Sequence, residues 1–120
     1  MKANPPPDKR ADACYRLTVY VPAQDAEALK DALFAAGAGR YEAYERCCWQ
    51  VLGDGQFLPL PGANPAVGAV GREEHVAEMR IEFICLETDL PAITEALYAA
   101  HPYETPAFDF APVIRPPRKT

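Results

Sequence analysis

The stretch Val76-Ala-Glu-Met-Arg-Ile-Glu-Phe-Ile-Cys-Leu86 decides the fold, because its side chains alternate between two kinds. Small or apolar residues occupy every second position, at Ala77, Met79, Ile81, Phe83 and Cys85. Charged residues lie between them, at Glu78, Arg80 and Glu82. A period of two is typical of a strand with one buried face. The sequence therefore predicts a half-buried strand over residues 76–86.

The segment at the start of the ordered region predicts a second strand of the same kind. Apolar and polar residues alternate over residues 15–21, and Pro22 ends the run. Residues 23–36 follow, with apolar side chains at the spacing of an amphipathic helix. Gly37 and Gly39 then supply a stop at the carboxyl end of this helix.

A second helix and a last strand follow residues 76–86. We expect Asp89 to cap the helix, and we expect the helix to end near Ala100 because Pro102 disfavours the helical region for the residue before it. Aromatic residues then predict a short strand at 108–113.

The middle of the chain is predicted as a strand, a turn and a long loop. Residues 40–52 contain three aromatic residues, two cysteines and Val51, a composition that favours a strand. Gly53-Asp-Gly55 is a turn signal, after which Gln56-Phe-Leu58 is expected to pair back as a short extra hairpin. A glycine- and proline-rich connection runs from Pro59 to Gly71.

The predicted order is strand–helix–strand, loop, strand–helix–strand. Two such halves close as an α+β ferredoxin-like sandwich, with a four-stranded antiparallel sheet and both helices on one face. We expect one domain over residues 14–113, flanked by disordered tails at 1–13 and 114–120. The uncovered face is expected to carry Tyr20, Tyr44 and Ile84, so self-association is the expectation.

Composition narrows the classes of function. The chain has 120 residues and a net charge of −5, and an acidic body disfavours nucleic-acid binding. No apolar run approaches the ~20 residues that span a bilayer, and the amino terminus is not a secretory signal. The four cysteines form no Cys-x-x-Cys pair and are expected to be reduced. These features predict a cytoplasmic protein that binds neither nucleic acid nor membranes.

The glycine-rich loop is the first candidate site. Its glycines let backbone amides approach an anion or another small ligand, so Gly62, Asn64, Gly68 and Gly71 are candidate ligand-binding residues. The loop contains no basic residue, and Arg72 and Arg80 are the nearest candidate cations. A structural crossover that packs against a neighbouring subunit is the alternative.

The second candidate is His101-Pro-Tyr-Glu104, in which Tyr103 is a candidate ligand contact. His101 and Glu104 are candidate ligands for a divalent metal, with Glu82 or His75 as a third. The alternative is a turn that ends the helix, in which Tyr103 packs. No nucleophile–base or zinc-protease motif occurs, and we expect no catalytic activity.

Several motifs together resemble a known family. They are Tyr15 to Pro22, Ala32-Leu-Phe-Ala-Ala-Gly-Ala-Gly39, Gly55-Gln-Phe57, Gly62-Ala-Asn-Pro65, Gly68-Ala-Val-Gly71, Arg80-Ile-Glu82 and His101-Pro-Tyr-Glu104. Their order and gaps resemble the insert domain of the YqfO branch of the Nif-three-like proteins, from about Tyr15 to Pro112. The resemblance implies a fold similar to CutA and the PII signalling proteins, which tends to form trimers. The name GTP cyclohydrolase type 2 is sometimes attached to the full-length proteins of this family. In those proteins a separate flanking domain carries the ligands of a two-metal centre, and these ligands have no counterpart in this sequence.

Three functions remain open at this point. The first is an oligomeric binding or regulatory module with a small ligand, the second a CutA-like divalent-metal protein, and the third a metal-dependent nucleotide hydrolase. We expect any site to lie where the glycine-rich loop meets the His-Pro-Tyr-Glu turn, across a subunit boundary.

Overall fold

The computed structural model describes residues 13–115. The tails predicted at 1–13 and 114–120 fall almost entirely outside the described residues. The strands are β1 (Cys14–Pro22), β2 (Trp49–Phe57), β3 (Glu74–Leu86) and β4 (Phe108–Val113). The α-helices are α2 (Ala26–Ala35) and α3 (Leu90–Ala100), each preceded by one 3-10 turn, η1 (Ala23–Asp25) and η2 (Glu87–Asp89).

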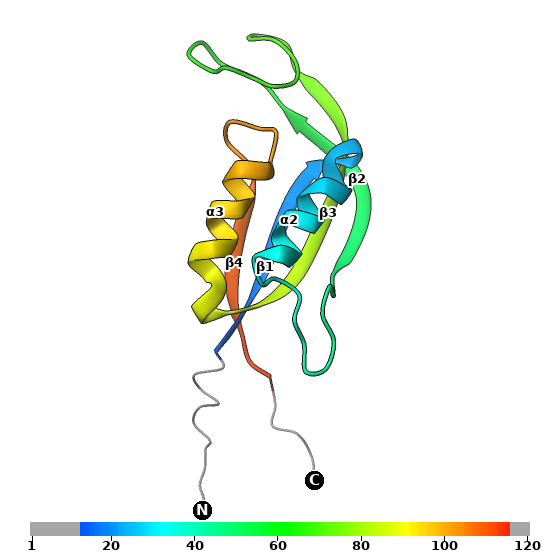
Figure 1. Ribbon diagram of the computed structural model, residues 1–120. Helices are drawn as coiled ribbons and strands as arrows, with labels where there is room; N and C mark the ends of the chain where they lie inside the picture. The colour runs from blue at the N-terminus through cyan, green and yellow to red at the C-terminus, as the bar shows by residue number, and fades with distance from the viewer. Residues whose placement is uncertain (1–12, 116–120) are drawn as a thin grey trace, which may run out of the picture.

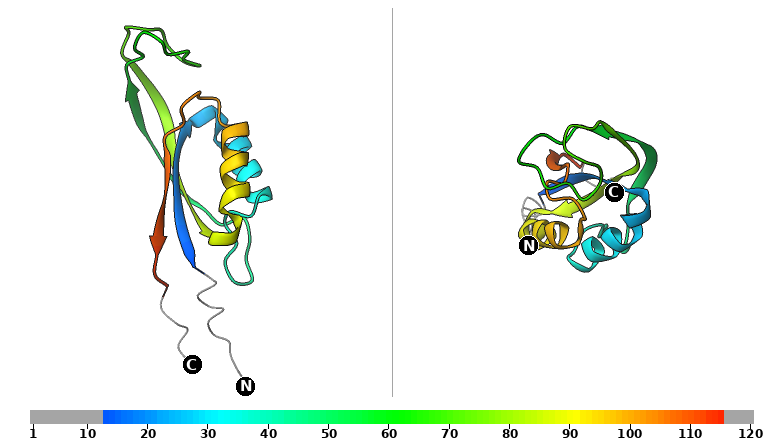
Figure 2. Two further views of the ribbon diagram at one scale, coloured as in Figure 1. Left: turned by 90° about the vertical axis from the view of Figure 1, so that its left-hand side faces the viewer. Right: turned by 90° about the horizontal axis from the view of Figure 1, so that it is seen from above.

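The four strands form one antiparallel sheet in the order β2-β3-β1-β4. Both helices lie on the same face of this sheet, and the opposite face is bare (Figures 1 and 2). The α+β ferredoxin-like prediction is confirmed. β1 ends at Pro22, opposite Glu78, so the first part of β3 pairs with β2 alone. The β2–β3 arm therefore extends beyond the two-helix layer, as Figure 1 shows.

The core lies between the helices and the middle of the sheet. Its largest fully buried side chains come from both helices and both central strands: Leu17, Val19, Val21, Leu29, Leu33, Ile81, Phe83, Cys85, Ile93 and Leu97. Each such apolar side chain stabilises the fold by about 1.5–3 kcal/mol. Along β3 the alternation predicted from the sequence holds for Ile81, Phe83 and Cys85, whereas Ala77 is exposed because the helices do not reach it.

The predicted hairpin at Gly53-Asp-Gly55 is wrong. β2 continues through this segment, with Gly53 opposite Glu78 and Gly55 opposite Val76. Neither glycine has a positive φ, as a primed hairpin turn would require. Gly55 instead permits a close approach, because a Cβ there would overlap the Glu78 carboxylate.

The strand predicted over 40–52 begins later, at Trp49. Residues before it form a loop in which Tyr41 and Tyr44 bridge to each other, so Tyr44 does not lie on the sheet face as predicted. Glu42 and Arg46 have φ values of 54° and 62°. These left-handed conformations are incompatible with an extended strand.

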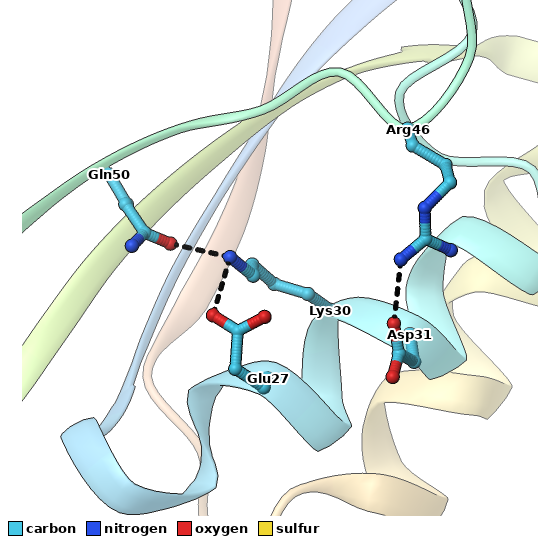
Figure 3. A network of polar contacts seen from close by, with 5 residues as sticks. All are labelled: Glu27, Lys30, Asp31, Arg46 and Gln50. Carbon is cyan, nitrogen blue, oxygen red and sulfur yellow. Dashed lines mark hydrogen bonds and ion pairs between the residues drawn. The ribbon is translucent and has the colours of Figure 1, made fainter.

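Polar contacts attach β2 and this loop to helix α2 (Figure 3). Lys30 Nζ donates a hydrogen bond of 3.0 Å to Gln50 Oε1 on β2 and lies 2.7 Å from Glu27. Arg46 of the loop donates a 2.8 Å bond to Asp31. These contacts fix the edge strand against the helix layer.

The carboxyl end of α3 agrees with the prediction, whereas the predicted capping bond at its amino end is missing. At the carboxyl end, His101 is extended with ψ of 134°, as Pro102 requires, and the helix ends at Ala100. At the amino end, Asp89 makes no side-chain capping bond. Its carboxylate group packs against Gly37 instead, since η2 places the residue in a helical conformation.

Candidate functional site

A groove opens where the β2–β3 arm extends past the end of β1. Its volume is about 620 Å³, within the range of about 300–1,000 Å³ typical of small-molecule sites. One wall is the start of the glycine-rich loop and is mostly apolar, with Leu58, Pro59, Leu60, Ala63, Pro65 and Val67. The other side carries the polar groups, with Glu78 of β3 and the turn residues Tyr103, Glu104 and Thr105.

The two predicted segments meet at this groove. The backbone N–H of Asn64 donates a 2.7 Å hydrogen bond to Glu104 Oε1, across 40 residues of sequence. A charged acceptor makes this contact stronger than an ordinary backbone bond. The expectation that the loop and the turn lie together is therefore confirmed within a single chain. Whether a second subunit completes the groove stays a prediction.

Tyr103 stands at the centre of the polar side. Its hydroxyl donates a 3.0 Å hydrogen bond to Glu78 Oε2, and its ring meets Phe57 edge to face at 5.8 Å. Burial and the adjacent Glu78 carboxylate both raise the pKa of Tyr103. The phenol therefore stays protonated as a hydrogen-bond donor, which orients Glu78.

His101 holds the turn against the sheet. Its Nε2 lies 2.7 Å from the carbonyl oxygen of Tyr20, and its Nδ1 accepts a 3.1 Å bond from the backbone N–H of Tyr103. The first contact requires Nε2–H and the second requires an unprotonated Nδ1, so the ring is neutral with its proton on Nε2. Burial lowers the pKa of His101, against the opposing pull of Glu78 and Asp25. Only 6% of the residue is exposed.

The predicted metal ligands are not brought together. Both ring nitrogens of His101 are already engaged, and Glu82 lies on the bare sheet face beside Arg80 at 3.1 Å. His75 pairs with Glu73 at 2.7 Å. Residues 13–115 contain no group of three or more His, Cys, Asp or Glu residues that could hold a metal ion. The metal site stays a prediction that this arrangement does not favour.

The predicted loop glycines shape the groove without lining it. Gly62, Gly68 and Gly71 have φ values of 101°, 86° and 81°, which favour glycine. The N–H of Gly71 donates to the carbonyl of Pro59 at 2.8 Å and closes the base of the loop. These glycines therefore form turns of the loop. Among the described residues, no contact supports the prediction that their amides face a ligand.

Arg80 lies outside the groove as well. Its guanidinium bonds Glu82 and lies 5.9 Å from the centre of the Trp49 ring. With Tyr20, Val51 and Glu78 it lines a second hollow of about 190 Å³ on the bare sheet face, and Glu78 is shared with the groove. Of the six predicted ligand residues, Tyr103 lines the groove and Asn64 borders it.

The sequence reasoning missed the apolar wall and Glu78. The signal that indicates the wall is the density of apolar residues from Phe57 to Val67. The prediction for this segment rested on its glycines alone. Glu78 was assigned to the solvent face of a strand. Only the register of β3 with β2 and the reach of Tyr103 place its carboxylate in the groove.

Proteins with related sequences are much longer than this chain. A "GTP cyclohydrolase 1 type 2 homolog" from Mycobacterium leprae is 46% identical over 99 residues, which are 82% of this chain and 26% of that protein. The Bacillus subtilis protein of the same name is 40% identical over 106 residues, 88% of this chain and 28% of its own length. The chain is a homologue of one segment of the Nif-three-like proteins. It spans about a quarter of the length of these relatives, and no protein-family model matches it.

Solved structures agree with this similarity to a segment of Nif-three-like proteins. A Bacillus cereus protein related to NIF3 matches with a TM-score of 0.75 and 34% identity, over 87% of this chain and 26% of that one. The periplasmic divalent cation tolerance protein CutA from Archaeoglobus fulgidus matches with a TM-score of 0.63 and 16% identity, over 88% of both chains. A Bacillus subtilis GlnK–ATP complex matches with a TM-score of 0.57 and 11% identity, over 85% and 83%. The last two show a shared fold only.

Among residues 13–115, neither helix has the length and apolar character needed to cross a membrane.

Proposed function

We propose that this Nif-three-like chain is an oligomeric binding module that holds a small ligand in the groove between residues 58–67 and 103–107. The observation that carries the proposal is the Asn64–Glu104 hydrogen bond, which joins the two sides of the groove. Tyr103 is fixed by three further contacts, to His101, Glu78 and Phe57. A site whose polar groups are already oriented loses less entropy when a ligand binds.

Binding rather than turnover is proposed because of the groups that the groove presents. Glu78 and Glu104 are the charged residues of its lining, and their carboxylates repel the phosphates of a nucleotide. The relatives carry the name of a GTP cyclohydrolase homologue, and this chain matches only about a quarter of their length. We therefore expect no hydrolysis of GTP by the isolated chain, with or without added divalent metal, in an assay for released phosphate and formate.

A ligand screen with a blocking variant tests the groove. Ala63 is exposed on its apolar wall, so Ala63→Trp should fill the space without disturbing the core. Ala92→Trp on the exposed side of α3 is the matched control. Fragments that bind the parent chain by ligand-observed NMR should bind the control and should fail to bind Ala63→Trp. Equal binding by both variants would place the ligand elsewhere.

Self-association is proposed from the bare sheet face. Trp49 and Val51 are 57% and 43% exposed and share this face with Tyr20, at 38%. Apolar side chains gathered on one face mark an interaction surface. The resemblance to the Nif-three-like insert domain predicts a trimer, and we propose that assembly here.

Two neighbouring residues on β2 offer a matched test of this face. Val51→Glu places a charge on the bare face, whereas Leu52→Glu places one on the opposite side of the same strand. Sedimentation velocity should show a trimer for the parent and for Leu52→Glu, and a monomer for Val51→Glu. A trimer with all three chains would refute the assignment of the interface.

A cytoplasmic location is also proposed. Cys47, Cys48 and Cys85 form no disulfide bond, which suits a reducing compartment. Fractionation of the producing cells, with a thiol-labelling assay on the extracted protein, tests this location.

A further inference from the structure

We infer that the groove selects a ligand with an apolar body and one positively charged group, such as a primary amine, and excludes anionic ligands. The inference rests on the proposed binding function and adds the chemical class of the ligand. It differs from the anion-binding role that the glycine-rich loop suggests from sequence.

The charge of the groove is the first step. Glu78 and Glu104 line it, and no lysine, arginine or histidine does so within residues 13–115. Neither carboxylate forms an ion pair with a basic side chain in that same described range, although Arg80 and Arg16 both pair with Glu82 nearby. A ligand cation would therefore find two carboxylates that no ion pair within residues 13–115 neutralises, although Arg80 lines the neighbouring hollow together with Glu78.

The hydrogen bonds leave acceptor capacity toward the groove. Glu78 accepts one bond, from the Tyr103 hydroxyl, and Glu104 accepts one, from the Asn64 N–H. An ionised carboxylate offers about four lone-pair sites, so each retains capacity for an ammonium donor. Both existing bonds come from uncharged donors. They hold each carboxylate group in place without neutralising its negative charge.

Aromatic rings and the apolar wall define the rest of the ligand. Phe57 and Tyr103 meet edge to face at 5.8 Å and both line the groove. Aromatic faces attract ammonium groups, with about 0.5–1 kcal/mol at exposed sites. Leu58, Leu60 and Val67 add apolar surface to the same groove. An aliphatic or aromatic body with a terminal amine matches both sides at once.

A series of probes with one body and different end groups tests this inference. Phenylbutylamine, phenylbutanol and phenylvalerate share a phenylbutyl body and carry a positive, a neutral and a negative end. In NMR titrations of the full chain, we expect the amine to bind about tenfold more tightly than the alcohol, from two partly exposed carboxylates plus a ring contact. The acid should bind more weakly than the alcohol.

Charge-removing variants identify the groups responsible. In Glu78→Gln and Glu104→Gln the side-chain carbonyl still accepts the bond from Tyr103 or Asn64, so the groove keeps its shape while one negative charge is lost. Each variant should reduce the preference for the amine by about threefold, and the double variant should abolish it. Glu95→Gln on the exposed surface of α3 is the control and should keep the full preference.

The outcomes separate this inference from the proposed function. If the alcohol and the amine bind equally and Ala63→Trp blocks both, the groove is a binding site and the charge inference is wrong. If the acid binds best, the anion-binding interpretation replaces ours. If Ala63→Trp blocks none of the probes, both the binding site and the charge inference fall.

Discussion

Protonation of His101 should destabilise the fold, because the neutral ring joins three parts of the structure. Its Nε2–H donates to the end of β1 at Tyr20, and its Nδ1 accepts the N–H of Tyr103. A proton on Nδ1 would set two donors against each other across 3.1 Å. The buried position leaves little water to replace the lost bond, so the folded state resists protonation.

The sign of the pH dependence follows from the lowered pKa. Burial holds the pKa of folded His101 below its usual value of about 6.5, while Glu78 and Asp25 oppose the shift. Between these two pKa values the unfolded chain binds more protons than the folded chain, so the free energy of unfolding rises with pH. The stabilisation is complete above about pH 6.5 and is lost as the pH falls toward the folded pKa.

Two substitutions separate the contacts of the ring. His101→Asn can retain an acceptor near the Nδ1 position, and His101→Gln can retain a donor near the Nε2 position. Each leaves one buried polar partner unsatisfied, which costs about 1–3 kcal/mol. At about pH 7.5, where wild-type His101 is neutral, both variants should therefore be less stable than the parent by that amount.

Urea denaturation between about pH 5 and about pH 8 measures the effect. The deficit of each variant relative to the parent should shrink as the pH falls, because only the parent loses the histidine contribution. His75→Asn, at the exposed histidine on β3, is the control and keeps the His101 contribution. A deficit that stays constant across the pH range would refute the assignment of the buried neutral ring.

Three further predictions concern other parts of the molecule. Gly55→Ala should destabilise the chain by about 0.5–1.5 kcal/mol in urea denaturation, since its Cβ would displace the flexible Glu78 carboxylate from its hydrogen bond with Tyr103. Gly53→Ala, with open space around it, should change stability by less than about 0.5 kcal/mol. Untagged protein should contain well below one equivalent of divalent metal by elemental analysis, with no difference in His101→Ala. One equivalent that disappears in that variant would establish the metal site. Burial raises the pKa of the Cys85 thiol to about 12, so iodoacetamide at neutral pH should label the exposed Cys48 and leave Cys85 unmodified until the protein unfolds.

The sequence predicted the elements whose pattern is local. The period of two over 76–86 and the helical spacing over 23–36 each indicate which side of the element faces the core. The structure has strand β3 over the first segment and helix α2 within the second. The error at Gly53-Asp-Gly55 arose because the same glycines serve a turn or a close approach. The choice between them depends on Glu78, which belongs to a different strand. Local propensity cannot supply that partner.

The site was predictable only in its two segments. Composition marked residues 59–71 and 101–104 as unusual, and the structure joins them through Asn64 and Glu104. Of the two interpretations of His101, the contacts of its ring favour the turn that ends the helix over the metal ligand. The sequence could not decide between them, because the carbonyl of Tyr20 becomes a neighbour of His101 only when β1 pairs with β3 and β4.

His101 and the groove are parts of one structural unit. The ring fixes the backbone of Tyr103, the phenol of Tyr103 orients Glu78, and the next residue in the chain, Glu104, holds the loop through Asn64. His101 itself is not among the residues that line the groove. Its substitution should therefore weaken ligand binding through loss of order while the charge of the groove is unchanged. His101→Asn should bind phenylbutylamine and phenylbutanol more weakly by the same factor, whereas Glu78→Gln should weaken the amine selectively. That difference distinguishes a residue that positions the site from one that contacts the ligand.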